Sequence, residues 1–494
     1  MNTPLISFLF IFLLCCGTTS ADTLNRGNGA EPDSLNIHLA QGINSHNILL
    51  DLYEGLMTFD AHGEVVYGAA ERHELNDDQQ QWIFYLRADA QWSDGSPLLA
   101  QDFVKAWQQA IEPKTAAPYR HLFANLLQGE KLQVHAANPH ELVIKLNHPD
   151  AGFLNKLVLP IFFPLPPHHK DVTVSNGAYY LQQWNIQEYI SLKKNPHFHG
   201  AKEVAMDEVI YWVTENQNSE LLRFRAGELD YTETIPDHQI DWLKQNLSEQ
   251  LKIAPYYGTF FLGLNLNDQQ LKNPFLRQAL SHAIDRGILV DKVLKSGQKI
   301  ATNIIPPRNP VIQDPLFDLT KAKDLLKKSG FKPDTDRVEL LYNNSDNQKK
   351  VALAIAAMWR QNLGVKTQLK NQEWKMFVVT RKSSQKQVFR SGWIADYYDP
   401  LNFLELFLTD SHFNFYGFNN PNYNQTIMEL YNQSDSGQSK QLIEKAQSIL
   451  AQELPVIPIY HYVSRHLVNQ QLTGYHSNLM DKHLSRYLKI SPLD

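Results

Sequence analysis

Histidines are the residues of this chain whose spacing most directly suggests chemistry, because two close groups of them could bind a metal ion. These groups are His168-His169 and His197-Phe198-His199. Adjacent histidines in a strand point to opposite faces, and no cysteine or carboxylate completes either group at the spacing of known metal sites. The sequence therefore predicts no bound metal.

Motifs of the common enzyme classes are also missing. The chain has no G-x-S-x-G turn, no glycine-rich phosphate loop ending in Lys-Ser or Lys-Thr, no H-E-x-x-H and no pair of C-x-x-C clusters. We therefore expect a protein that is not an enzyme and that needs no cofactor.

Length and charge narrow the class of protein further. The chain has 494 residues and a formal net charge of -6. One hydrophobic core rarely serves so many residues, so two or three domains are expected. A slightly acidic chain lacks the positive field that gathers nucleic acid, so no nucleic-acid partner is expected.

The first residues predict export. An apolar run covers residues 5–14 and is too short to span a bilayer of about 30 Å as a helix. Thr19-Ser20-Ala21 follows with small residues at the cleavage position of a signal peptide, so the mature chain is expected to begin at Asp22. The alternative is a lipid on Cys16, but Cys15 is not the small residue that usually precedes a lipidated cysteine.

Helical and strand-like segments alternate along the rest of the chain, which favours open α/β lobes over a sandwich or a bundle. Strands are predicted at residues 81–86, 142–146, 209–213 and 260–266. Helices are predicted at residues 100–111, 274–293, 320–328, 349–362 and 439–453.

A tight turn followed by a helix carries the most informative motif. Asp94-Gly95-Ser96-Pro97 is a turn signal, and a connection between a strand and a packed helix is all that this pattern requires physically. Its residues nevertheless resemble the signature of the family 5 extracellular solute-binding proteins. The matching positions are Leu86-Arg87, Trp92-Ser93-Asp94-Gly95, Ala100, Asp102-Phe103 and Trp107.

The resemblance covers almost the whole mature chain, and it is greatest to the oligopeptide- and murein-peptide-binding branch of that family. Two segments indicate this branch, Asn371-Gln372-Glu373-Trp374-Lys375 and Arg390-Ser391-Gly392-Trp393-Ile394-Ala395-Asp396-Tyr397. The chain departs from the family at His73, where tryptophan is common, and it is shorter after Tyr119 and after Pro167. The shape of the cleft is therefore expected to differ.

This resemblance implies an α/β fold of the periplasmic-binding-protein type, a two-lobe clamshell with an extra small domain. Proline-rich residues 159–167 and the segment 255–258 would then mark crossings between units, and the chain would return near Tyr475. Of the three domains, the first is discontinuous. The expected boundaries are residues 22–46, 168–257 and 475–494 for domain I, 47–167 for domain II, and 258–474 for domain III.

The resemblance also implies a function. The protein would be a periplasmic monomer that captures short peptides in the cleft and passes them to the membrane permease of an ABC importer. The same scaffold could bind another ligand, such as a dipeptide, a murein peptide, an antimicrobial peptide, haem or a metal chelate. A peptidase is the more distant alternative, against which the missing motifs argue.

By the same resemblance, Asp396 would meet the amine of the peptide, and Gly392-Trp393-Ile394 would pair with its backbone. Arg390 would bind the terminal carboxylate. From the residues alone, Asp396 could form a structural salt bridge or a turn, and Arg390 could be a solvated charge at a strand end. Gly392 would let a second chain approach closely.

Other candidates surround this motif. The rings of Trp374 and Trp393 would either belong to the core or line pockets for varied side chains. Four candidates would contact the ligand from other parts of the cleft, with the acids on the opposite strand: Tyr119, Tyr475, Glu31 and Asp33.

Overall fold

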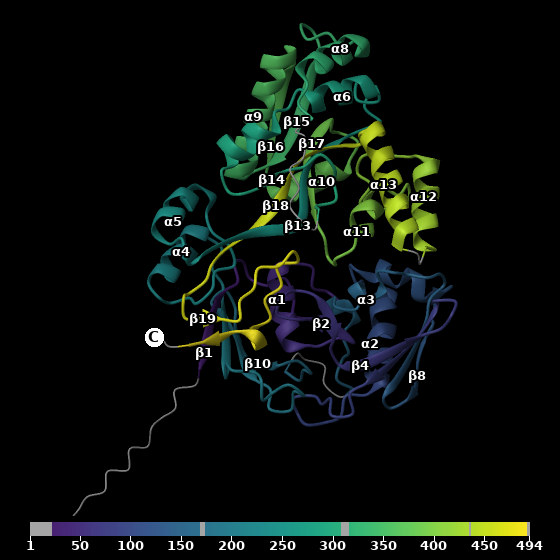
Figure 1. Ribbon diagram of the computed structural model, residues 1–494, viewed down its shortest axis with the longest axis vertical. Coiled ribbons are helices and arrows are strands. Elements are labelled where there is room, and N and C mark those ends of the chain that lie inside the picture. Colours follow the sequence, from purple (N-terminus) through teal and green to yellow (C-terminus); the bar gives the residue numbers. More distant parts are fainter. Residues whose placement is uncertain (1–21, 168–172, 308–315, 434–435, 492–494) are drawn as a thin grey trace, which may run out of the picture.

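The structure is a computed structural model that describes residues 22–167, 173–307, 316–433 and 436–491. It has two lobes, one above the other along the longest axis (Figure 1). The predicted signal peptide at residues 1–21, with both cysteines, lies outside the described residues, as does His168-His169. None of the helices in these ranges is long and apolar enough to cross a membrane.

The lower lobe in Figure 1 contains two four-stranded sheets. One has the order β1-β12-β11-β10, in which β1 is parallel to β12, and the other has the order β4-β5-β9-β8. The strands of the first are β1 (Thr23–Gly27), β10 (Tyr179–Asn185), β11 (Tyr189–Lys194) and β12 (Glu208–Trp212). Those of the second are β4 (Ala70–Leu75), β5 (Gln81–Leu86), β8 (Val134–Asn138) and β9 (Glu141–Lys145).

Short helices and two-stranded ribbons accompany these sheets, and the last ribbon comes from the C-terminal segment. The helices are α1 (Ile43–Leu52), α2 (Ala100–Ile111), α3 (Phe153–Lys156), α4 (Gln217–Arg225) and α5 (Ile240–Asn246). The two-stranded ribbons are β2 (Met57–Phe59) with β3 (Val65–Tyr67), β6 (Leu127–Gln128) with β7 (Lys131–Leu132), and β19 (Leu472–Thr473) with β20 (Lys489–Ile490).

The upper lobe is built on a six-stranded mixed sheet of order β14-β18-β13-β17-β15-β16. Its strands are β13 (Leu251–Leu264), β14 (Lys299–Ile300), β15 (Arg337–Asn343), β16 (Lys366–Gln372), β17 (Val388–Ile394) and β18 (Val456–Leu467). Its helices are α6 (Pro274–His282), α7 (Arg286–Ile288), α8 (Leu319–Ser329), α9 (Asp346–Leu363), α10 (Trp374–Lys382), α11 (Leu401–Leu404), α12 (Pro421–Tyr431) and α13 (Ser436–Glu453).

The turn before α2 shows why the family-like residues occur together. Asp102 lies in the first turn of α2, and its carboxylate accepts the backbone N–H of Leu99 at 3.0 Å. The same oxygen accepts the indole N–H of Trp92 at 3.3 Å. Trp92 and Trp107 are fully buried. The motif therefore caps a helix and anchors it to the core, which is a structural role.

The prediction of one helix over residues 274–293 is wrong. The chain leaves α6 at His282, and Asp285 begins a new helix by accepting the backbone N–H of Ile288 at 3.0 Å. The next residue, Arg286, is buried and donates to the carbonyl of Pro458 at 2.7 Å. A contact with a distant strand thus turns the chain where periodicity alone predicts continuation.

Two antiparallel strands, β13 and β18, extend from the upper sheet toward the lower lobe (Figure 1). Their lower ends, Leu251 and Leu467, pack with α4 and α5. The predicted crossing at residues 255–258 lies within β13, where the register against β18 shifts between Pro255 and Thr259. The domain boundaries stay predictions, but the crossing itself is a continuous strand with a bulge.

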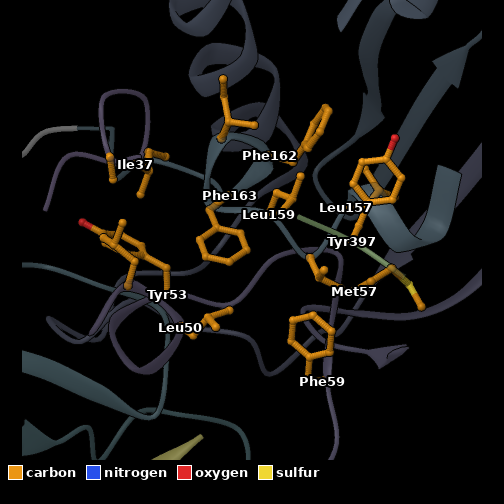
Figure 2. Close-up of a cluster of buried hydrophobic side chains, with 14 of the residues drawn as sticks. Ile37, Leu50, Tyr53, Met57, Phe59, Leu157, Leu159, Phe162, Phe163 and Tyr397 are labelled. Carbon is orange, nitrogen blue, oxygen red and sulfur yellow. The ribbon is translucent and has the colours of Figure 1, made fainter. Parts of the chain in front are cut away.

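The lobes pack against one another. Figure 2 shows Phe162 and Phe163 of the proline-rich segment among buried side chains of the lower lobe, with Tyr397 of the upper lobe beside Leu157. Across the same boundary, the side-chain amide of Asn155 donates to the carbonyl of Tyr398 at 2.9 Å. The two lobes are therefore in direct contact along this boundary.

Candidate ligand-binding site

A cavity of about 520 Å³ lies between the lobes. The lower lobe contributes His121, Asp150 and Lys156 to its wall, and the upper lobe contributes Trp393 and Asp396 among others. Ligands bind in such concave sites between domains because several chain segments can converge on one molecule there.

Asp396 follows β17 and is held in place by its neighbours. Its backbone N–H donates to the side-chain oxygen of Asn402 at 3.2 Å, and the indole N–H of Trp393 donates to the same oxygen at 2.7 Å. The hydroxyl of Tyr119 donates to the Asp396 carboxylate from the opposite lobe at 3.4 Å. Burial raises the pKa of Asp396 to about 6, although the positive charge of Lys482 opposes this shift. An ammonium ligand would relieve this unfavourable burial.

One edge of β17 is open for most of its length. β13 pairs with β17 from Val388 to Ile394, whereas β15 pairs with only Val388 and Phe389. Among the described residues, no strand pairs with that second edge from Arg390 to Ile394. An extended chain could add there as a further strand through backbone hydrogen bonds.

The space beside Gly392 is used differently from the expectation. A Cβ at this position would lie 2.6 Å from the hydroxyl oxygen of Tyr462. The missing side chain therefore makes room for a tyrosine of β18, and any approach of a ligand to Gly392 must come from the open edge.

Arg390 lies toward the other end of the open edge. Its guanidinium carbon is 5.9 Å from the ring of Trp374 and 5.9 Å from the ring of Phe260. Its Nε atom is buried without a hydrogen-bond partner in the described part of the chain, and the Nε atom of Arg381 is in the same condition. Buried donors without acceptors are costly, so this end of the site is suited to an anionic group.

The two predicted tryptophans differ in their surroundings. The ring of Trp393 packs edge-on against Phe413, with 4.9 Å between the ring centroids, and lines the cavity between the lobes. Trp374 begins α10, stacks on Phe377 and remains 48% exposed. Neither ring is fully buried, which fits side-chain pockets better than a core.

The two acids of the lower lobe, Glu31 and Asp33, were expected on a strand opposite β17. The structure places them instead in the loop between β1 and α1. Glu31 accepts the indole N–H of Trp184 at 2.7 Å. Asp33 accepts the hydroxyl of Ser45 and two backbone N–H groups. Burial alone would raise the pKa of Asp33, but these hydrogen bonds lower it. Both carboxylates are therefore already used within their own lobe.

Tyr475 also lies away from the cavity. Its ring stacks on His483 with 4.4 Å between the centroids, and it borders a separate surface hollow. Of the candidates outside the β17 segment, Tyr119 is the one whose hydroxyl reaches Asp396 across the lobes in the described part of the chain.

A cluster of charges in the cavity wall was missed by sequence reasoning. Lys156 pairs with Asp150 at 2.8 Å, and the hydroxyl of Tyr431 donates to Glu405 at 2.7 Å. Burial raises the pKa of Glu405 and raises that of Asp399 to about 6. Three carboxylates thus surround one ammonium. They come from two segments in different lobes, residues 150–156 and 399–405, so no single spacing motif contains the whole cluster.

Comparison with known proteins places this geometry in a family. Residues 64–415 match the sequence profile of the bacterial extracellular solute-binding proteins, family 5. The chain is 34% identical to the periplasmic oligopeptide-binding protein OppA of Salmonella typhimurium, over 92% of this chain and 89% of the relative. It is 32% identical to a probable deoxycholate-binding periplasmic protein of Escherichia coli, YgiS, over 91% and 89% of the two chains.

Solved structures agree with the sequence comparison. The murein tripeptide-binding protein MppA of Escherichia coli superposes with a TM-score of 0.83 at 30% identity, over 96% of this chain and 99% of that chain. OppA of Haemophilus influenzae, solved in complex with the peptide RPPGFSPFR, gives a TM-score of 0.81 at 31% identity, over 96% and 99%. The predicted two-lobe α/β fold is thereby confirmed. The chain belongs to family 5 of the bacterial extracellular solute-binding proteins.

Proposed function

We propose that this protein binds short peptides in extended form between its lobes. The observation that carries the proposal is the arrangement along β17, where a partly buried carboxylate, that of Asp396, lies beyond one end of an open strand edge. The partly unsatisfied guanidinium of Arg390 lies toward the other end. A peptide offers an amine, a row of backbone hydrogen-bonding groups and a carboxylate in that same order.

The length of the strand sets the scale of the ligand. Asp396 lies six positions after Arg390, which corresponds to about 20 Å of extended chain. Peptides of two to about six residues in extended form fit within this span. The side chains of the bound peptide would contact the wall of the cavity and the exposed ring of Trp374, which would set the preference for particular residues.

A bile acid is the second candidate, because one relative of similar identity is named for deoxycholate binding. Its single carboxylate could pair with Arg390, but it has no ammonium for Asp396 and no backbone for the open edge. The charge pattern therefore favours the peptide.

We expect peptides to raise the melting temperature of the purified protein. A ligand that binds only the native, closed form stabilises it by about 2.7 kcal/mol at one hundred times its dissociation constant. Differential scanning fluorimetry with a set of two- to six-residue peptides measures this shift. Stabilisation by deoxycholate, haem or a metal chelate, with none by any peptide, would overturn the proposal. Recovery of the added peptides intact after incubation would support a binding protein over a peptidase.

In the cell, we propose that the protein acts as a periplasmic monomer that delivers its ligand to the permease of an ABC importer. The name of the Salmonella relative and the apolar run at residues 5–14 support the compartment. We expect an unlipidated mature chain that starts at Asp22. Intact-mass spectrometry of the exported protein checks this start, and a mass that fits an acylated Cys16 would contradict it.

A further inference from the structure

Two histidines and an aspartate meet in the part of the molecule where the crossing strands reach the C-terminal segment. The Nε2 atom of His466, on β18, lies 2.9 Å and 3.1 Å from the two carboxylate oxygens of Asp481. The Nε2 atom of His483 lies 3.1 Å from one of those oxygens. One ligand atom from each residue falls within 4.8 Å of the others, so a single ion can reach all three.

The contact of the other ring nitrogen of His466 fixes the tautomer of this ring. Its Nδ1 lies 2.9 Å from the backbone carbonyl of Thr232, a contact that requires a proton on Nδ1. In the neutral ring, Nε2 then carries a lone pair that points at the Asp481 carboxylate, which is repulsive, whereas in the charged ring Nε2 donates to that carboxylate as an ion pair. A carbonyl that fixes the tautomer in this way is the usual support of a histidine that binds metal.

We propose that His466, Asp481 and His483 bind one divalent transition-metal ion of the zinc class. Two imidazole nitrogens and one carboxylate oxygen are a ligand set that zinc accepts, with water in the fourth position. A cation between the three groups removes the repulsion and neutralises Asp481. The carboxylate of Glu233 also acts on His466 and Asp481 and adds negative potential to the site, whereas the nearby cations Arg26 and Lys482 act in the opposite sense.

The surroundings leave a route to the site while keeping it mostly dry. The side chains of His466 and His483 are each 2% exposed, and that of Asp481 is 9% exposed. The ring of Tyr475 stacks on His483 and also borders a surface hollow of about 490 Å³, so a rotation of this ring would admit an ion. A bound metal would tie β18, which continues into the upper sheet, to the C-terminal segment of the lower lobe.

Zinc alone is the probe for the test. We expect protein stripped with a chelator to bind one zinc ion per chain in calorimetry and to melt at a higher temperature with zinc than without it. Cobalt in place of zinc should give the visible absorption of a tetrahedral site. His483→Gln and Asp481→Asn should each weaken zinc binding at least about tenfold, because each removes a ligand.

The control is His461→Gln. His461 is a buried histidine on the same strand and bonds to Thr259 through Nδ1, but it does not belong to the cluster. We expect its zinc affinity to equal that of the parent, and melting in chelator shows that each variant is folded. Absence of saturable binding below about 1 mM zinc would overturn the proposal. Equal zinc affinity in parent and both cluster variants would also overturn it, because the ion would then bind other histidines. In either case, the contacts described would belong to a protonated His466 paired with Asp481.

Discussion

Asp396→Asn is expected to weaken the binding of a peptide with a free amine by about 30- to 5,000-fold, which corresponds to about 2–5 kcal/mol. The substitution preserves shape but removes the counter-charge of the peptide ammonium, a partly buried carboxylate that lines the cavity between the lobes. An exposed pair would contribute only about 0–1 kcal/mol, so the size of the loss reports how dry the closed site is.

A double-mutant cycle separates this pair from other effects of the substitution. Calorimetry on parent and variant, each with a free and an N-acetylated peptide, yields the coupling between amine and carboxylate. We expect the acetylated peptide to bind the two proteins equally and weakly. If coupling is near zero and both peptides bind both proteins alike, the amine has another partner and the assignment of Asp396 fails.

The pH dependence provides an independent check on Asp396. Its pKa in the folded, ligand-free protein is about 6, above the ordinary value of 3.8. Peptide affinity should therefore be greatest above pH 6 and should decline below it as the carboxylate is protonated, and this decline should vanish in Asp396→Asn. For a carboxyl group whose pKa is raised by burial, ionisation costs folding free energy as pH rises from about 4 to about 6. At pH 7 the ligand-free variant should accordingly be as stable as the parent, or more stable.

Local signals explain which parts of the fold could be predicted from the sequence. Residues 81–86 and 100–111 have the same bounds in the structure as in the prediction, because β alternation, a turn and the cap at Asp102 all act within a few residues. The break after His282 could not be predicted, because it depends on Arg286 reaching the carbonyl of Pro458 on a strand far along the chain. The strand order of the upper sheet could not be predicted for the same reason, because it depends on pairing between strands that are far apart in the sequence.

The residues of the candidate site also fall into those that the sequence predicts and those that only the structure reveals. Asp396 and Arg390 were found because they lie in one contiguous motif, and the structure adds the open strand edge between them. Lys156 and Asp150 pair within the lower lobe, but Glu405 reaches them from the upper lobe, and each alone is an ordinary surface-type residue in the sequence. Asp33 was expected to face the ligand, but its hydrogen bonds to residues 41–45 assign its carboxylate to a loop instead.

Glu54 shows that a family-like segment can be structural. It belongs to Tyr53-Glu54-Gly55-Leu56 after α1, and its buried carboxylate accepts Arg486 of the C-terminal segment at 2.5 Å and contacts His199 at 2.8 Å. Arg486 also donates to the hydroxyl of Thr58 at 3.1 Å. One carboxylate thus joins three separate segments of the lower lobe. Its loss should lower the free energy of unfolding and leave ligand affinity unchanged.

We expect Glu54→Gln to lower the free energy of unfolding by about 3–5 kcal/mol, because it leaves the buried guanidinium of Arg486 without a counter-charge. Urea denaturation followed by circular dichroism measures the loss. The matched control is Glu74→Gln, which breaks an exposed pair of Glu74 with Arg72 at 2.7 Å and should change stability little. Equal losses of unfolding free energy in the two variants would show that burial does not make the Glu54 pair more stabilising than the exposed pair.

The pH dependence of stability provides a second test of the Glu54–Arg486 pair, because the direction of the pKa shift of Glu54 fixes whether stability rises or falls with pH. Burial alone would raise the pKa of Glu54, but Arg486 and His199 together hold it below its ordinary value of 4.5. A carboxylate whose folded pKa is depressed contributes stability above its unfolded pKa and loses that contribution as pH falls through the folded value. The parent should therefore lose stability below about pH 4.5 more steeply than Glu54→Gln, and the gap between their urea midpoints should narrow toward lower pH. A gap that stays constant across this range would mean that the loss at neutral pH comes from altered packing and not from the missing charge.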